Sequence, residues 1–247
     1  MNWFELAPTV SAAFLASLVE CVEAATILLA VGVVRGWRPA LAGLAVGLLA
    51  LAALVLALGP ALARLPEQAL QLFVGLLLLL FGMRWLRKAM LRGAGIIPLH
   101  DEDAIFRSET ANLRLARAGE RWGMDPAAFV AAFKAVLLEG VEVAFLVLAV
   151  AAGSPALIMP AAIGALAAAV LVAVVALAVH KPLAQVPENT LKFTVGVLIS
   201  AFGIFWTGEG LGIAWPGHDL ALLAIVAAVL LVALLGTRLA AGKEARA

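Results

Sequence analysis

Two long stretches of the chain carry no charged residue, Ala40–Ala63 and Val143–Val179. A helix that crosses the hydrocarbon core of a bilayer needs about 20 apolar residues, so the first stretch is long enough for one crossing. The second is too long for one helix, and the Gly153-Ser154-Pro155 segment predicts a break within it. The whole chain is 65% hydrophobic and 13% charged, whereas soluble domains are about 25% charged. The sequence therefore predicts a multi-pass membrane protein.

We expect an all-α fold with seven transmembrane helices. Turn chemistry supports the boundaries, since Asp125 followed by Pro126 is an N-cap with proline at the first helical position. The longest polar segment, residues 92–125, separates the third helix from the fourth, and Ser108–Trp122 within it could form a short amphipathic helix. The seven helices are expected at residues 9–34, 39–63, 67–91, 126–152, 156–180, 187–208 and 218–240.

The chain also repeats itself. AAFLASLVECVEAATILLAV (residues 12–31) matches AAFKAVLLEGVEVAFLVLAV (131–150), and PEQALQLFVGLLLLLFGMRW (66–85) matches PENTLKFTVGVLISAFGIFW (187–206). Each half has three expected spans, so the halves would enter the membrane in opposite directions. Inverted repeats of this kind are typical of transporters, although a duplicated scaffold without transport is an alternative. We expect a first repeat (1–91), a cytoplasmic loop (92–125), a second repeat (126–208), and an outer loop with a seventh helix and tail (209–247).

The basic residues predict the orientation, because cytoplasmic loops are enriched in Lys and Arg. With the N-terminus outside, every basic residue except Arg64 falls on the cytoplasmic side. The prediction is a plasma-membrane (inner-membrane) protein with an external N-terminus and a cytoplasmic C-terminus. No basic stripe with interleaved aromatic residues suggests nucleic acid binding. The lone cysteine, Cys21, excludes an intrachain disulfide or a thiolate metal cluster.

Four glutamates lie in the middle of expected membrane spans. Glu20 and Glu23 are in the first span, and Glu139 and Glu142 are at the equivalent place in the fourth. Residues three apart lie on the same side of a helix, and an inverted repeat would bring the two pairs together. Each acidic residue at this depth costs about 2.5–3.5 kcal/mol on insertion scales, so protons or a cation must neutralise the group. Hard carboxylate oxygens suit magnesium, calcium, manganese and iron ions.

The segments ECVEAATILLAV and EGVEVAFLVLAV resemble the Glu-Gly-Leu-Glu helices of the oxidase-dependent iron permeases. That family has seven spans, an external N-terminus and one such motif in each of the first and fourth helices. The resemblance covers nearly the whole membrane domain and implies that Glu20, Glu23, Glu139 and Glu142 bind iron on its path. The family motif usually begins with Arg, where this chain has Val19 and Leu138, so the chain looks like a divergent, short bacterial branch.

Several other residues are weaker candidates. Glu209, His218 and Asp219 could form an outer collecting site, with a solvated loop as the alternative. Glu67 and Glu188 follow helix-opening prolines and are interpreted as acids that meet a helix dipole. The segment from His100 to Asp103 is interpreted as a solvated loop, although it could sense metal. Four glycines occupy equivalent positions of the third and sixth spans and should allow close helix contact: Gly75, Gly82, Gly196 and Gly203.

The preferred hypothesis is a secondary transporter for a metal cation, iron or manganese, without enzymatic activity. We expect no permanently bound cofactor, only the transported ion. The expected partners are that cation and the lipid bilayer, and a homo-oligomer is compatible with the sequence. Two alternatives stay open at this point, a membrane-embedded metal-dependent hydrolase and a non-transporting assembly subunit. The glutamates could also stay protonated and bond helices together, or act as a proton relay.

Overall fold

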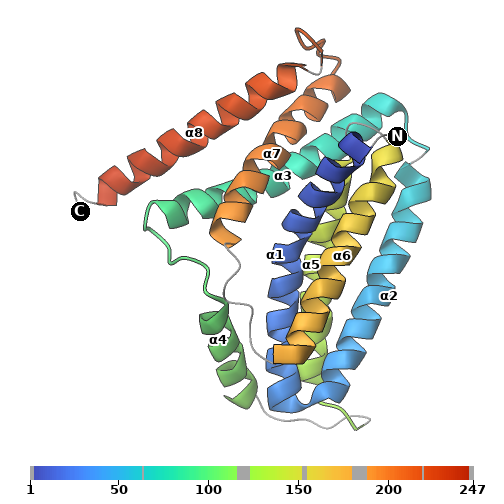
Figure 1. Ribbon diagram of the computed structural model, residues 1–247, viewed down its shortest axis with the longest axis vertical. Helices are drawn as coiled ribbons and strands as arrows, with labels where there is room; N and C mark the ends of the chain where they lie inside the picture. The colour runs from blue at the N-terminus through green and yellow to red at the C-terminus, as the bar shows by residue number, and fades with distance from the viewer. Residues whose placement is uncertain are drawn as a thin grey trace. The chain divides into compact units, whose positions relative to one another are not determined.

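A computed structural model of the chain describes residues 3–62, 64–115, 123–151, 155–179, 188–218 and 220–244. Regular structure in these ranges is helical (Figure 1). The elements are α1 (Trp3–Arg35), α2 (Trp37–Leu62), α3 (Glu67–Gly93), α4 (Glu102–Leu115), α5 (Pro126–Val150), the 3-10 turn η1 (Pro155–Leu157), α6 (Ile158–Val179), α7 (Glu188–Gly210) and α8 (Leu220–Glu244).

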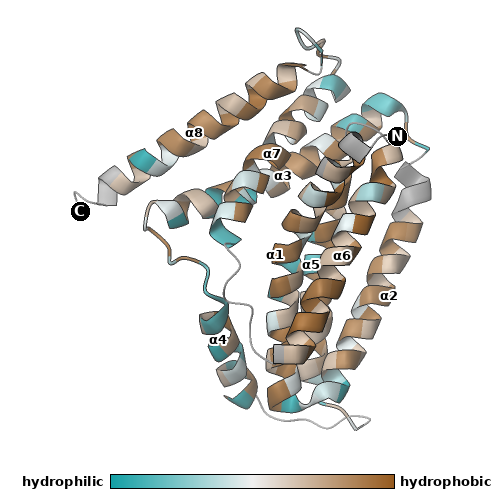
Figure 2. Ribbon diagram, in the orientation of Figure 1, coloured by the Kyte–Doolittle hydropathy of each residue, from teal (hydrophilic) through white to brown (hydrophobic). Residues whose placement is uncertain are grey.

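Six of these helices are long and apolar enough to cross a membrane: α1, α2, α3, α6, α7 and α8. Figure 2 shows the apolar residues that run along them, whereas α4 is largely polar. The expectation of seven such helices differs from this count at α5. That helix forms where it was predicted, but every 18-residue stretch of it contains Lys134, Glu139 and Glu142. The difference therefore comes from the charges that α5 carries and not from its length.

The boundaries of the long helices follow the turn signals in the sequence. Asp125 caps α5 as predicted, with its Oδ1 accepting hydrogen bonds from the backbone nitrogens of Ala127 and Ala128. The amphipathic helix expected at Ser108–Trp122 begins earlier, because α4 covers Glu102–Leu115, and residues 116–122 of the expected helix lie outside the described residues. Asp101 Oδ1 accepts a bond from the backbone nitrogen of Ala104, which starts α4 six residues earlier than expected.

The chain divides into two compact units, and each is described by itself. Unit 1 comprises residues 1–59 and 101–186, and therefore holds α1, nearly all of α2, and α4, α5 and α6. Unit 2 comprises residues 60–100 and 187–247, and holds α3, α7 and α8. Helices that match in the internal repeat stay together, since α1 and α5 share unit 1 while α3 and α7 share unit 2.

In unit 1, glycines on α2 and α5 set the direction of helix packing. A Cβ added to Gly43 would lie 2.6 Å from the Cβ of Ala132, and one added to Gly47 would lie 3.0 Å from the Cβ of Val136. The residue numbers rise together, so α2 and α5 are parallel. Gly36, with φ of 94°, joins α1 to α2 in a tight hairpin. α1 is therefore antiparallel to α5, its counterpart in the repeat (Figure 1).

In unit 2, α3 and α7 approach each other at the predicted glycines. Added Cβ atoms would lie 2.5 Å from the backbone nitrogen of Thr207 at Gly75, and 2.4 Å from that of Leu79 at Gly203. Residue numbers fall on α7 as they rise on α3, so this pair is also antiparallel. The prediction of close contact at the four glycines is confirmed, because Gly82 and Gly196 also face backbone atoms of the opposite helix.

Candidate metal centre

Three glutamates come together inside unit 1. Glu20 on α1 and Glu139 and Glu142 on α5 each place a carboxylate oxygen within 4.8 Å of the other two. The side chain of Glu20 is 0% exposed and that of Glu142 is 8% exposed, while Glu139 is partly buried. We call these residues the three-glutamate cluster. The two helices that supply them are the antiparallel repeat counterparts described above.

Glu23, the fourth glutamate of the predicted site, lies one turn further along α1. It is partly buried, and it does not belong to the group of three. Three residues advance an α-helix by about 300°, so Glu23 projects about 60° away from the direction of Glu20. The structure thus brings three of the four predicted side chains together and sets Glu23 beside them on the same helix.

Neighbouring residues enclose the cluster. Gly140, between the two acids of α5, allows α2 to come close, since a Cβ there would lie 2.6 Å from Leu51 Cδ2. Ser17, one turn before Glu20, is fully buried, and its Oγ has no hydrogen-bond partner among the described residues. Lys134 lies on α5 five residues before Glu139 and is exposed. Carboxylates from two helices thus meet in unit 1, and the nearest basic residue on α5 is exposed.

The chemistry of the cluster follows from its donors. Three carboxylates that share a small buried volume repel one another unless protons or a cation separate their charges. All three offer hard oxygen atoms, which suit divalent magnesium, calcium, manganese and iron ions. No histidine or cysteine belongs to this group, although Cys21 follows Glu20 directly. The donor set therefore favours a hard divalent cation.

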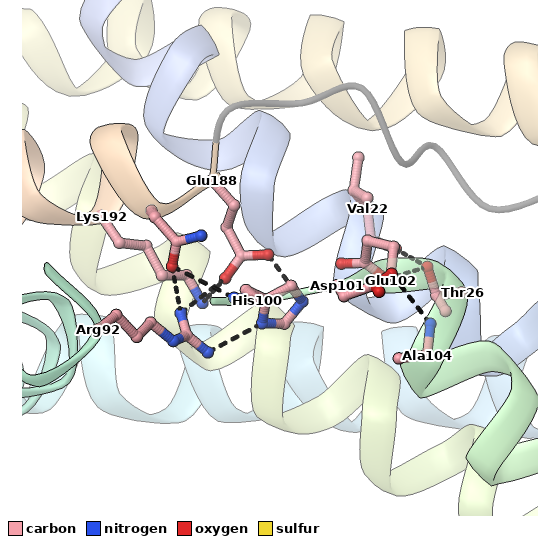
Figure 3. A network of polar contacts seen from close by, with 10 residues as sticks. Val22, Thr26, Arg92, His100, Asp101, Glu102, Ala104, Glu188 and Lys192 are labelled. Atoms are coloured by element: carbon pink, nitrogen blue, oxygen red, sulfur yellow. Dashed lines mark hydrogen bonds and ion pairs between the residues drawn. The ribbon is translucent and has the colours of Figure 1, made fainter. Parts of the chain in front are cut away.

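A second buried carboxylate lies in the same unit, at the start of α4. Glu102 Oε2 is in hydrogen-bond contact with Thr26 Oγ1, which also lies 3.0 Å from the backbone oxygen of Val22 (Figure 3). Glu102 is 6% exposed. The interpretation of residues 100–103 as a solvated loop is therefore wrong for Glu102. The sequence analysis missed this placement because it did not identify Asp101 as the N-cap of α4. A helix that begins at Glu102 packs against α1 and buries that side chain.

Unit 2 contains a different arrangement, centred on Glu188 in the first turn of α7. Its carboxylate lies 2.7 Å from His100 Nε2, 3.4 Å from Arg92 Nη1 and 3.6 Å from Lys192 Nζ (Figure 3). Asn189 Oδ1 accepts a further bond from Arg92 at 3.0 Å. The interpretation of Glu188 as a simple helix-dipole acid is therefore incomplete, and the side chain of His100 is only 8% exposed instead of solvated. The four-residue spacing of Glu188 and Lys192 was the signal in the sequence.

The hydrogen positions in this arrangement can be assigned. Arg92 Nη2 lies 3.1 Å from His100 Nδ1, and a guanidinium nitrogen can only donate. Nδ1 therefore accepts, and the hydrogen of the ring sits on Nε2, from which it points at Glu188. In this geometry His100 is the neutral tautomer, and the two permanent cations that share the Glu188 carboxylate are Arg92 and Lys192. Glu188 thus holds together the end of α3, the start of α7 and the segment that leads to residue 100.

The predicted outer group of Glu209, His218 and Asp219 is not assembled by the described residues. Glu209 accepts a hydrogen bond from Gln71 Nε2 at 3.1 Å, which joins α7 to α3. His218 is exposed, and Asp219 lies outside the described residues. Among the residues that the structure describes, no group of three metal-ligating side chains includes Glu209 or His218.

Comparisons with known proteins identified no relative of this chain. Searches against protein-family models, curated proteins and solved structures each returned no match. The function of the chain therefore has to be inferred from its own residues.

Proposed function

We propose that the chain transports a divalent metal cation across the membrane by way of the three-glutamate cluster, with Glu23 as a further ligand along the path. One observation supports this most strongly: the carboxylates of Glu20, Glu139 and Glu142 lie within 4.8 Å of one another in the middle of two antiparallel helices. Buried carboxylates at such a position are costly and typically mark an ion pathway. A cation that enters the cluster would offset their mutual repulsion.

The proposed cargo is iron or manganese. Both are hard enough for an all-carboxylate site, and the resemblance to the oxidase-dependent iron permeases points to the same class of ion. A metal-dependent hydrolase is a weaker alternative, since such enzymes normally use histidine ligands or an adjacent nucleophile. The cation is substrate in this proposal, and the protein itself performs no bond chemistry.

The proposal includes a topology of seven crossings, in which α5 is the crossing that the hydropathy of the chain does not reveal. Its acidic residues belong to the transport site and face α1, so they do not prevent α5 from crossing beside α1. With an external N-terminus, α4 would lie on the cytoplasmic side of an inner membrane. A reporter fused after His100 should then be cytoplasmic, whereas a reporter at the N-terminus should be external. An external signal from the His100 fusion would contradict this topology.

The direct test is metal flux into liposomes that contain the purified protein. Replacing Glu20, Glu139 or Glu142 with Gln keeps the size and hydrogen-bonding groups of the side chain but removes one negative charge. We expect each replacement to lower the initial rate of Mn²⁺ or Fe²⁺ uptake at least 100-fold. Glu23→Gln should have a smaller effect, because Glu23 lies outside the group of three. Glu67→Gln, which changes an exposed acid, is the matched control and should transport normally.

The same variants distinguish a shared site from two redundant copies. If both Glu139→Gln and Glu142→Gln retain full transport while Glu20→Gln loses it, the α5 acids are not part of the path. If all three variants transport normally, the proposed function is wrong. Insertion and monodispersity of each variant, measured by size-exclusion chromatography, separate a transport defect from misfolding.

Cation binding should also release protons. Protons compete with a cation for the carboxylate oxygens, so affinity should fall as the pH is lowered. Calorimetric titrations in buffers of different ionisation enthalpy measure the number of protons released. Binding that releases no proton at any pH tested would contradict this competition.

A further inference from the structure

The exposed side of α3 changes its character along the helix. Its first part is apolar, and the side chains there are between 44% and 67% exposed: Phe73, Leu76, Leu80 and Met83. Its last part is basic and also exposed: Arg84, Arg87 and Lys88. With about 3.6 residues per turn, all of these positions fall within a sector of about 140° around the helix. Gly75 and Gly82, which meet α7, lie on the opposite side.

The dipole of α3 does not account for these basic residues. A helix dipole favours cations only within about its last turn. The last turn of α3 contains Arg92, which contacts Glu188. With a rise of about 1.5 Å per residue, Lys88 lies about 7.5 Å and Arg84 about 13.5 Å before the end of the helix at Gly93. Their charges are therefore placed well inside the helix.

Ion pairing within the chain does not account for Arg87 and Lys88 either. Ion pairs join several other basic residues to acids: Arg35 to Asp125, Arg92 and Lys192 to Glu188, and Arg107 to Asp101. Among the residues that the structure describes, Arg87 and Lys88 take part in no such pair. The sequence of α3 contains one acid, Glu67, which lies in its first turn. No acid of α3 thus offsets the charges near its other end.

The spacing of the basic residues adds to their cost. Arg87 and Lys88 follow Arg84 at the three- and four-residue spacings that make side chains neighbours on a helix surface. Like charges at these spacings destabilise a helix. An anionic group that lies against all three side chains would replace this repulsion with attraction. The arrangement therefore favours an anionic partner.

The residues beside the basic group indicate the class of that partner. Arginine binds a phosphate through two parallel hydrogen bonds, and lysine adds a point charge. Leu80 and Met83 lie about one turn or less before Arg84 on the same exposed side of the helix. A free phosphate gains nothing from these apolar side chains, whereas the acyl chains of a phospholipid bury them. α3 is also long and apolar enough to cross a membrane, where such lipids surround it.

We propose that Arg84, Arg87 and Lys88 bind the headgroup of an anionic phospholipid, whose acyl chains lie along Leu80 and Met83. Long basic side chains can extend from an apolar stretch of helix to the headgroup layer, which fits their position before the end of α3. The site belongs to unit 2 and shares no residue with the three-glutamate cluster. The inference therefore goes beyond the proposed function and does not depend on it.

Native mass spectrometry of the purified full-length chain tests the inference. The chain is titrated in detergent with phosphatidylglycerol and, separately, with phosphatidylcholine, and the spectra count the lipids retained per chain. We expect the wild-type chain to bind phosphatidylglycerol about tenfold more tightly than phosphatidylcholine. Arg87→Gln should weaken phosphatidylglycerol about threefold, and Arg87→Gln with Lys88→Gln about tenfold, with phosphatidylcholine unchanged. Arg64→Gln, which changes an exposed basic residue before the other end of α3, is the matched control and should bind as the wild-type chain does.

Two further measurements keep the test independent of how the glutamine variants fold. Exchanging the two side chains, Arg87→Lys with Lys88→Arg, keeps both charges and should keep the preference for phosphatidylglycerol. For the wild-type chain, raising the salt from about 0.05 M to about 0.5 M should reduce that preference, because salt screens exposed charges. The inference is overturned if the double glutamine variant binds phosphatidylglycerol as tightly as the wild-type chain, or if Arg64→Gln weakens it equally. A preference that salt leaves unchanged would overturn it as well.

Discussion

The chain contains two antiparallel pairs of repeat counterparts, α1 with α5 and α3 with α7, and it uses them differently. α3 and α7 meet through glycines whose missing side chains bring the backbones into contact. α1 and α5 instead bring together the buried acids Glu20, Glu139 and Glu142. A duplicated segment thus supplies one pair that holds helices together and one pair that carries acidic chemistry.

The buried acids of the two units also differ in which charged groups surround them. Glu188 in unit 2 lies beside Arg92 and Lys192, which offset its charge, and beside His100. The acids of the three-glutamate cluster surround each other. A carboxylate that is paired with cations in the fold contributes to stability, whereas carboxylates gathered together reduce stability until a cation arrives. The two sets should therefore respond to loss of charge with opposite signs.

The largest expected effect is at Glu188. Glu188→Gln leaves Arg92 and Lys192, whose side chains are 10% and 9% exposed, without the carboxylate that they share. Removing one partner of a buried ion pair typically costs about 3–5 kcal/mol, so we expect that loss in the free energy of unfolding. Thermal unfolding in detergent micelles provides the measurement, and Glu67 offers a matched control.

Glu67 occupies the position of Glu188 in the first repeat, but it is exposed in the first turn of α3. Glu67→Gln removes only its interaction with the helix dipole and should cost about 0.3–1 kcal/mol. If Glu67→Gln and Glu188→Gln have equal effects, the buried contacts of Glu188 add nothing to stability.

The sequence predicts one of these two pairs better than the other. Glycines seven residues apart on α3 and α7 predicted the close contact, because only the missing Cβ matters and the sequence displays it directly. The polar contacts of Glu188 and Glu102 were not predicted. They depend on how residues 94–102 fold between α3 and α4, and that path is decided by tertiary packing. The position of Glu23 outside the group of three likewise depends on the rotation of α1, which a three-residue spacing does not fix.

A smaller loss is expected in the α3–α7 pair. A Cβ at Gly203 would lie 2.4 Å from the backbone nitrogen of Leu79, which cannot move without displacing α3. We expect Gly203→Ala to cost about 1–3 kcal/mol despite the higher helix propensity of alanine. Gly236→Ala is the control, since its nearest atom is Met90 Cε, the end of a flexible side chain. It should be neutral or slightly stabilising, and an equal loss at both sites would rule out backbone contact as the cause.

The smallest expected effect has the opposite sign and concerns the α1–α5 pair. Two unit charges about 4 Å apart repel by about 1 kcal/mol in water and by more in a less polar medium. Glu142→Gln removes one charge from the three-glutamate cluster, so in the presence of a chelator the free energy of unfolding should rise by about 1 kcal/mol. Adding Mn²⁺ should reverse the order, because the wild-type chain gains the binding free energy, about 2.7 kcal/mol at 100 times Kd, and the variant gains less. Unfolding curves of both proteins with chelator and with Mn²⁺ test this crossing. If Glu142→Gln lowers stability in chelator as Glu188→Gln does, the acids of α1 and α5 bond the helices together, and the contrast between the two helix pairs disappears.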